Sequence, residues 1–317
     1  MIFLSLAVFA NRIMDVQTTG SIPQKSLQVL LAGTIDYAGL FPPSQISMPE
    51  AVINYATYKN SNYNWLLGRF IVPLGRLGEF YESARDFISR DGKSAWRISV
   101  IAGEDINDTI RRIEEFNGNN APGVICDAIE LKASTGSKIE NTVSALPPGI
   151  NAYFELPLVD DLDDLVSALA FTGQRAKIRT GGVTTDAFPT SRQIIRFART
   201  CLAANVPFKA TAGLHHPLRC FIPLTYAPDS PEGAMHGFLN VFLMTGFARE
   251  GFRTMLLEDL MEEEYEEAFQ FDENGVTWHE HGLGLSQLER ARTNGIISFG
   301  SCSFDEPIAD LRQFGLL

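Results

Sequence analysis

Short apolar runs alternate with amphipathic stretches along most of the chain. Eight of the apolar runs have the length and composition of strands, and the stretches between them place apolar residues on one helical face. The predicted strands are residues 29–36, 65–74, 96–102, 123–132, 152–158, 176–180, 208–212 and 296–303. The predicted helices are residues 48–60, 77–89, 105–116, 138–146, 162–171, 191–204 and a closing helix through 310–314. Alternating strands and helices imply parallel strands, and eight such units predict an α/β fold of the (β/α)8 TIM-barrel type.

The alternation is interrupted before the last predicted strand. Residues 215–295 separate the seventh and eighth strands and contain at least two predicted helices. We therefore expect an N-terminal extension, residues 1–28, followed by a single barrel over residues 29–317 with a helical insertion at about 215–295. Residues 237–247 are apolar but too short to cross a membrane. They predict a buried helix, with the interface of a homo-oligomer as the alternative.

Charge and cysteine content restrict the classes of partner and the compartment. The 317 residues carry a formal net charge of -12, so neither nucleic acid nor an anionic membrane is an expected partner. Seven of the ten residues 258–267 are acidic, which is typical of a solvated helix face. The four cysteines show no Cys-x-x-Cys spacing, which favours reduced thiols in a cytoplasmic protein. Residues 1–10 are apolar without a preceding basic segment; a signal peptide and an upstream start are the alternatives there.

Ionisable residues gather where the predicted strands end, which is where barrels carry their function. The polar residues expected there are Asp36, Arg69, Glu130, Lys132, Glu155, Lys177, Arg179, Lys209, Thr211, Ser301 and Ser303. Lys177 and Lys209 lie on neighbouring predicted strands. Desolvation and a second nearby cation both lower the pKa of a lysine, which frees its amine to form a Schiff base with a carbonyl compound. Glu130 or Asp36 is a candidate for proton transfer.

The strand ends resemble those of the deoxyribose-phosphate aldolase group of class I aldolases. The similar segments are Lys177-Ile-Arg-Thr-Gly181, Lys209-Ala-Thr-Ala-Gly213, Gly300-Ser-Cys-Ser303, Asp36 on the first strand and Glu130 on the fourth. The resemblance implies a barrel in which Lys177 forms the Schiff base, Lys209 lowers its pKa and Glu130 belongs to a proton relay. Arg179, where the family has a small hydroxyl residue, indicates a different substrate.

The same resemblance and the excess of positive charge at the strand ends imply a small anionic carbonyl compound as substrate. Gly300 and Ser301 are expected to hold its phosphate or carboxylate group through backbone N–H and hydroxyl donors. The remaining predicted substrate-binding residues are Arg179, Gly181, Gly182, Thr211, Gly213, Ser303, Glu155 and Arg69. This hypothesis requires no cofactor.

Two other hypotheses remain open from the sequence. His215 and His216 follow the seventh strand, and His279 and His281 lie two residues apart, so a divalent metal held by histidines and carboxylates is an alternative. Such a site would indicate a metal-dependent hydrolase or isomerase. The third hypothesis is a barrel without catalysis, in which the ionisable residues form structural ion pairs and the insertion binds a partner.

Overall fold

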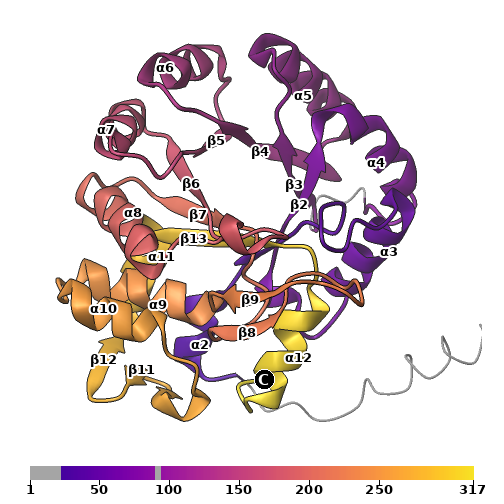
Figure 1. Ribbon diagram of the computed structural model, residues 1–317. Coiled ribbons are helices and arrows are strands. Elements are labelled where there is room, and N and C mark those ends of the chain that lie inside the picture. The colour runs from indigo at the N-terminus through magenta and orange to yellow at the C-terminus, as the bar shows by residue number, and fades with distance from the viewer. Residues whose placement is uncertain (1–22, 90–93) are drawn as a thin grey trace, which may run out of the picture.

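Eight parallel strands close into a barrel in the computed structural model, which describes residues 23–89 and 94–317 (Figure 1). The strands run around the barrel in the order β1, β2, β3, β4, β5, β6, β7, β13, and β13 pairs with β1. They are β1 (Ile35–Tyr37), β2 (Leu67–Pro73), β3 (Trp96–Ile101), β4 (Val124–Lys132), β5 (Asn151–Glu155), β6 (Arg175–Arg179), β7 (Phe208–Thr211) and β13 (Ile296–Ser301). The predicted (β/α)8 barrel is confirmed.

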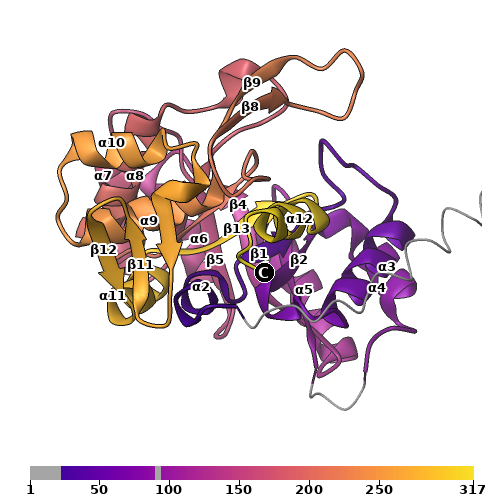
Figure 2. The same cartoon turned by 90° about the horizontal axis from the view of Figure 1, so that it is seen from below.

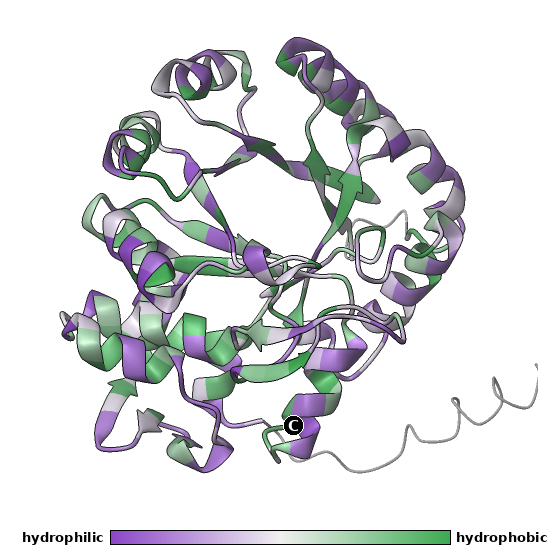
Figure 3. Cartoon of the chain, in the orientation of Figure 1, coloured by the Kyte–Doolittle hydropathy of each residue, from purple (hydrophilic) through white to green (hydrophobic). Residues whose placement is uncertain are grey.

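Helices surround the strands and cover the apolar outer side of the barrel. They are α3 (Met48–Lys59), α4 (Leu77–Ala84), α5 (Ile106–Asn120), α6 (Gly136–Ala145), α7 (Leu162–Thr172), α8 (Ser191–Ala203) and α12 (Asp305–Gln313). Local signals fix several of their starts; in α3, Ser47 and Glu50 form a capping box that satisfies free backbone N–H groups. In Figure 3, much of β2 and β3 is hydrophobic, although these strands also carry Arg69 and Arg97, and β5 and β6 include hydrophilic residues. Polar side chains therefore occur on strands all around the barrel, from Asp36 on β1 to Ser298 on β13.

The first predicted strand is wrong in its position. Residues 29–31 belong to a helix, α2 (Lys25–Leu31), and the strand β1 begins only at Ile35. The apolar run Val29-Leu-Leu suits either a strand or the buried face of a helix, and its short length does not distinguish them. Leu27, Leu30 and Leu31 are buried, so the ordered fold begins earlier than the predicted boundary at residue 29. The predictions for residues 1–10 lie outside the described residues.

The segment between β7 and β13 contains helices, as predicted, and also strands that the prediction did not include. Its elements are β8 (Cys220–Pro223), β9 (Glu232–Met235), α9 (Phe238–Arg249), α10 (Thr254–Met261), β10 (Phe269–Phe271), β11 (Gly275–Trp278), β12 (His281–Gly284) and α11 (Leu285–Asn294). The β8–β9 hairpin extends beyond one end of the barrel (Figure 2). The strands β10, β11 and β12 form a small antiparallel sheet. Residues 272–274 connect β10 to β11, two short strands that the apolar pattern does not predict.

Helix α9 belongs to the layer of helices around the barrel and does not present a free apolar surface. It packs against α8 and β13, and the ring of Phe238 stacks on that of Phe299 with centroids 5.0 Å apart. Every residue from Phe238 to Phe247 is buried. The prediction of a buried helix is confirmed, and its apolar face is occupied within the chain. No helix among the described residues is long and apolar enough to cross a membrane.

Candidate active site

A row of alternating positive and negative side chains crosses the barrel. Lys209 Nζ lies 2.5 Å from Asp36 Oδ2 and 2.8 Å from Glu130 Oε1. Lys177 Nζ lies 2.8 Å from the other oxygen of Glu130 and 3.0 Å from Glu155 Oε2. Arg179 ends the row, with its Nε 3.3 Å from Glu155 Oε1. All of these side chains are among the site residues predicted from the sequence, and each cation lies between or beside carboxylates.

Lys209 is the most enclosed cation of the row. Its side chain is 1% exposed, and its amine also lies 5.4 Å from the centre of the Tyr153 ring. Burial alone favours a neutral amine, but the charges of Asp36 and Glu130 outweigh burial and raise the pKa of Lys209. Asp36 is fixed in turn by the Ser298 hydroxyl, which donates to Oδ2 over 2.7 Å. Lys209 is therefore a fixed ammonium.

Lys177 occupies the same level of the barrel and, like Lys209, lines the cavity described below, but its side chain is more exposed. Lys177 and Lys209 are partners in the register of β6 and β7, so their side chains point to the same side. Glu130 accepts from both amines and from the Ser99 hydroxyl, 2.8 Å away. Burial opposes its charge, but the two lysines outweigh burial and hold the pKa of Glu130 well below its usual range.

A carboxylate therefore lies between the two amines and contacts both of them. The negative charge of Glu130 offsets part of the repulsion between the two ammonium groups. Glu155 has the same balance on the outer side: burial opposes its charge, and Lys177 and then Arg179 lower its pKa. Glu155 is less enclosed than Glu130, with 11% of its side chain exposed against 2%. Lys177 thus lies between a deep carboxylate and one closer to solvent.

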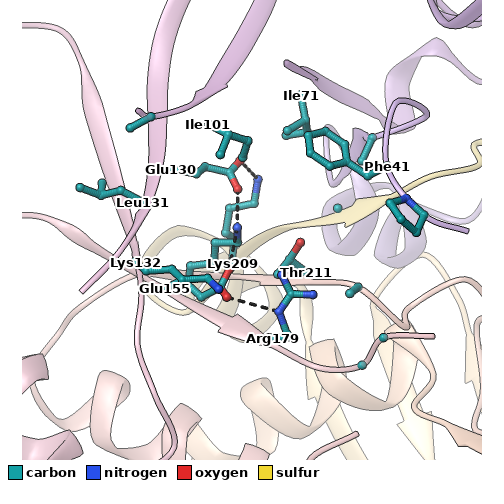
Figure 4. A pocket seen from close by; sticks show the side chains of 18 of the residues that line it. Phe41, Ile71, Ile101, Glu130, Leu131, Lys132, Glu155, Arg179, Lys209 and Thr211 are labelled. Carbon is teal, nitrogen blue, oxygen red and sulfur yellow. Dashed lines mark hydrogen bonds and ion pairs between the residues drawn. The ribbon is translucent and has the colours of Figure 1, made fainter. Parts of the chain in front are cut away.

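The row opens into a cavity of about 1120 Å³. Lys177, Lys209, Glu130, Glu155 and Arg179 all contribute to its wall. An apolar surface completes it, formed by Phe41, Ile71, Ile101 and Leu131, which Figure 4 shows around the charged side chains. Arg179 is half-exposed at the rim. The cavity can therefore hold a molecule with a polar end at the row and an apolar part beyond it.

Glycines bring the ends of β6 and β7 close together at the cavity. The Cα atoms of Gly181 and Gly213 approach so closely that a Cβ on Gly181 would lie 2.8 Å from the Cα of Gly213. Gly213 has a φ of +72°, a conformation that other residues rarely adopt. Gly181, Gly182, Gly213, Thr211 and Gly300 line the cavity, as the sequence analysis predicted. Backbone, rather than side chains, forms this part of the wall.

Four predicted residues lie elsewhere. Asp36 is buried behind Lys209 and does not line the cavity. Arg69 pairs with Asp127 near the amino ends of β2 and β4, because it is the third residue of β2 and the cavity begins at Ile71, two residues later. Neither Ser301 nor Ser303 contributes to the cavity wall; the Ser303 hydroxyl accepts from the backbone N–H of Glu306 at the start of α12. The structure therefore does not place these serines where they could hold a substrate anion in the cavity.

The candidate metal-binding histidines do not come together. His215 and His216 contact different carboxylates of α12, Glu306 at 3.1 Å and Asp310 at 2.6 Å. His281 begins β12 of the small sheet, and His279 lies in the turn before it, where it contacts Glu263 at 3.0 Å. Within residues 23–89 and 94–317, no group of three or more histidine, cysteine, aspartate or glutamate side chains is arranged to hold a metal ion.

Sequence reasoning missed a second polar cluster on the cavity wall. His215 Nδ1 lies 3.1 Å from Glu306 Oε2 and 3.9 Å from the sulfur of Cys302, and the Ser44 hydroxyl donates to that sulfur over 3.1 Å. The Tyr226 hydroxyl donates to Glu306 over 2.7 Å and lies 3.9 Å from the sulfur. The sequence offered one signal for this cluster, Cys302 between two serines at the end of the last strand. The prediction gave a role in anion binding to the serines and none to the cysteine.

Comparison of the chain with protein-family models, with curated protein sequences and with solved structures finds no match. The function is therefore inferred from the fold and from the arrangement of the side chains.

Proposed function

We propose that the protein is a class I aldolase-type lyase that forms a Schiff base between Lys177 and a small anionic carbonyl compound. The observation that carries the proposal is the placement of Lys177 on the cavity wall between Glu130 and Glu155, with Lys209 fixed behind them. A lysine beside two carboxylates in an enclosed cavity has both an electrophile-accessible amine and proton acceptors within hydrogen-bond distance.

Glu155 is the group that removes a proton from the Lys177 ammonium. Its carboxylate is 3.0 Å from Nζ and is also held by Arg179. A substrate anion that binds Arg179 competes with Glu155 for the guanidinium. Because Arg179 lowers the pKa of Glu155, the loss of that contact raises it and makes Glu155 a stronger base. Substrate binding thereby promotes formation of the free amine.

The covalent steps follow from this arrangement. The Lys177 amine attacks the carbonyl carbon, the carbonyl oxygen takes up a proton from protonated Glu155, and a second proton transfer releases it as water to leave an iminium ion. The iminium accepts the electron pair of the adjacent carbon–carbon bond while a carboxylate removes the proton of the β-hydroxyl group, so that one carbonyl product leaves and an enamine remains. Protonation at carbon and hydrolysis by water return the amine and the second product. Lys209 and Glu130 keep a fixed charge distribution beside the reacting nitrogen.

The cavity favours substrates with an anionic group and a carbon skeleton of moderate size. Arg179 at the rim is suited to a phosphate or carboxylate, which its planar guanidinium can bind through two hydrogen bonds. Phe41, Ile71 and Ile101 face this charge across the cavity and can contact carbon atoms of the ligand. The backbone at Gly181 and Gly182 allows a ligand to approach closely.

Exchange of α-protons tests this proposal without knowledge of the full substrate. An iminium ion acidifies the neighbouring C–H bonds, so aldehydes and ketones that react with Lys177 should exchange these protons with D2O. A panel of small carbonyl compounds, with and without phosphate or carboxylate groups, is followed by NMR in the presence of the protein. We expect exchange that is lost in K177M and retained in K25M, which changes an exposed lysine on α2. Exchange at equal rates in K177M, or none with any compound, would contradict the proposal.

A further inference from the structure

The cluster around Cys302 is a second chemically active part of the cavity wall, separate from the lysine row. Cys302 and His215 both line the cavity, and their partners come from three further segments: Glu306 on α12, Ser44 after β1 and Tyr226 after β8. Ordinary packing does not require an imidazole, a carboxylate and two hydroxyl groups around one thiol.

We propose that Cys302 is a reactive thiolate and the site at which hydroperoxides that enter the cavity oxidise this protein to a sulfenic acid. The geometry gives the sulfur a cationic neighbour in His215 and a hydrogen-bond donor in Ser44. These are the features that stabilise a thiolate. The cavity gives access for a small oxidant, although only 5% of the Cys302 surface is exposed.

Electrostatics agree with the geometry. Burial opposes the charge of His215, but its contacts with Cys302 and Glu306 raise its pKa to about 9, so the imidazole is protonated at neutral pH. Burial also opposes the thiolate, but the hydrogen bond and charge of His215 outweigh burial and lower the pKa of Cys302. Other ionisable groups near the sulfur are Glu306, Tyr226 and Tyr37. Burial raises the pKa of both phenols, so they stay neutral, and Glu306 is the anion that competes for His215.

The reaction is balanced with the hydroperoxide as the only added reagent. The sulfur attacks one peroxide oxygen, an S–O bond forms and the O–O bond breaks. The thiolate is oxidised by two electrons to the sulfenic acid, and the peroxide is reduced. The His215 imidazolium protonates the leaving group, which departs as water from hydrogen peroxide or as an alcohol from an organic hydroperoxide, and leaves a neutral imidazole. His215 thus stabilises the thiolate before the reaction and supplies the proton during it.

The other three cysteines are internal controls. Cys126 and Cys201 are buried away from the cavity, and Cys220 is half-buried on β8. Burial raises the pKa of all three thiols, to about 12 for Cys126 and about 11 for Cys220. Their thiols are therefore un-ionised at neutral pH, and selectivity for Cys302 can be measured within one molecule.

The test is oxidation of the full chain with a small excess of hydrogen peroxide at pH 7, with dimedone present to trap the sulfenic acid. Mass spectrometry of the peptides then gives the rate of labelling at each cysteine. A free thiol of ordinary pKa is only a few per cent ionised at this pH, so we expect Cys302 to react at least about tenfold faster than Cys220. Labelling of Cys302 no faster than of Cys220 would overturn the proposal.

Matched variants separate the role of His215 from general effects on folding. H215Q should lower the rate of Cys302 labelling by about tenfold, because the thiolate loses its cationic neighbour and the leaving group its proton donor. H216Q changes the adjacent histidine, which contacts Asp310 instead, and should leave the rate unchanged. An unchanged rate in folded H215Q, as judged by circular dichroism, would also overturn the proposal. K177M should not affect the labelling, so this test is independent of the lyase hypothesis.

Discussion

The lysine row and the Cys302 cluster line the same cavity but differ in how their charges are balanced. In the row, Asp36, Glu130 and Glu155 alternate with three cations, so each charge has a partner of opposite sign. In the cluster, one imidazole serves both a carboxylate and a thiol. The row therefore keeps its charges near neutral pH, whereas the cluster contains a group whose pKa of about 9 is within reach of mild alkali. The charges of the row are therefore constant near neutral pH, whereas the charge of the cluster changes when the pH rises.

The largest effect should follow from removal of the charge at the centre of the row. E130Q keeps the shape of the side chain but leaves Lys209 with one carboxylate and Lys177 without its deep partner. Loss of one member of a buried ion pair costs about 3–5 kcal/mol, and we expect a loss of this size in the free energy of unfolding. Urea denaturation with an unchanged m-value measures it. A loss in E130Q no greater than that in E155Q, at the more open end, would show that the deep carboxylate is not the central element.

The second prediction concerns the pH dependence of stability. Because the pKa of His215 is raised to about 9, its contribution is fully present below the unfolded value of about 6.5 and is lost as the pH rises through about 9. The contribution of His215 to the unfolding free energy should therefore fall on the order of 2 kcal/mol between pH 7 and pH 10, and the thiolate of Cys302, whose pKa is lowered, offsets part of this decline. H215Q should remove most of this decline and H216Q should retain it. An identical decline in both variants would assign it to other groups.

A smaller effect is expected at the rim of the row. R179Q removes the guanidinium that we assign to the substrate anion, while its half-exposed position limits the cost to folding. The concentration of an anionic carbonyl compound that gives half-maximal α-proton exchange should rise about tenfold, as loss of a charge-assisted hydrogen bond requires. A neutral carbonyl compound is the control and should show little change. Equal effects on both compounds would indicate that Arg179 acts only on the structure.

The smallest effect should come from the hydrogen bond behind Lys209. S298A removes the hydroxyl that donates to Asp36 Oδ2, but the carboxylate keeps the Lys209 ammonium and the backbone N–H of Arg69. We expect a loss of about 1 kcal/mol in the free energy of unfolding. Thermal denaturation followed by circular dichroism is sufficient to detect it. A loss as large as that of E130Q would show that Ser298, rather than the charges, fixes the arrangement.

The sequence predicted the barrel because strand and helix periodicities are local properties. Lys177 and Lys209 were found because each precedes a glycine at a predicted strand end, a signal contained in five residues. The position of the first strand was wrong because Val29 to Leu31 carry no information on whether an apolar run is helical. The local sequence pattern is thus sufficient to predict most helices and strands and to identify individual site residues.

The pairing of those residues depends on the closed barrel and was not predictable. Which carboxylate lies between the two lysines follows from the register of β4 to β7. The Cys302 cluster brings together residues that are even further apart in the sequence, since Ser44 and Cys302 are separated by 258 positions. Its position is set by how α12 and the β8–β9 hairpin pack at the cavity.

Reductive trapping tests the central claim, that Lys177 is the reactive amine and Lys209 the fixed cation. The protein is incubated with small anionic aldehydes and ketones, sodium borohydride is added, and modified peptides are mapped by mass spectrometry. The account predicts a stable adduct on Lys177 that exceeds modification of every other lysine, with none on Lys209. An adduct on Lys209, or no selective adduct with any carbonyl compound, would contradict it.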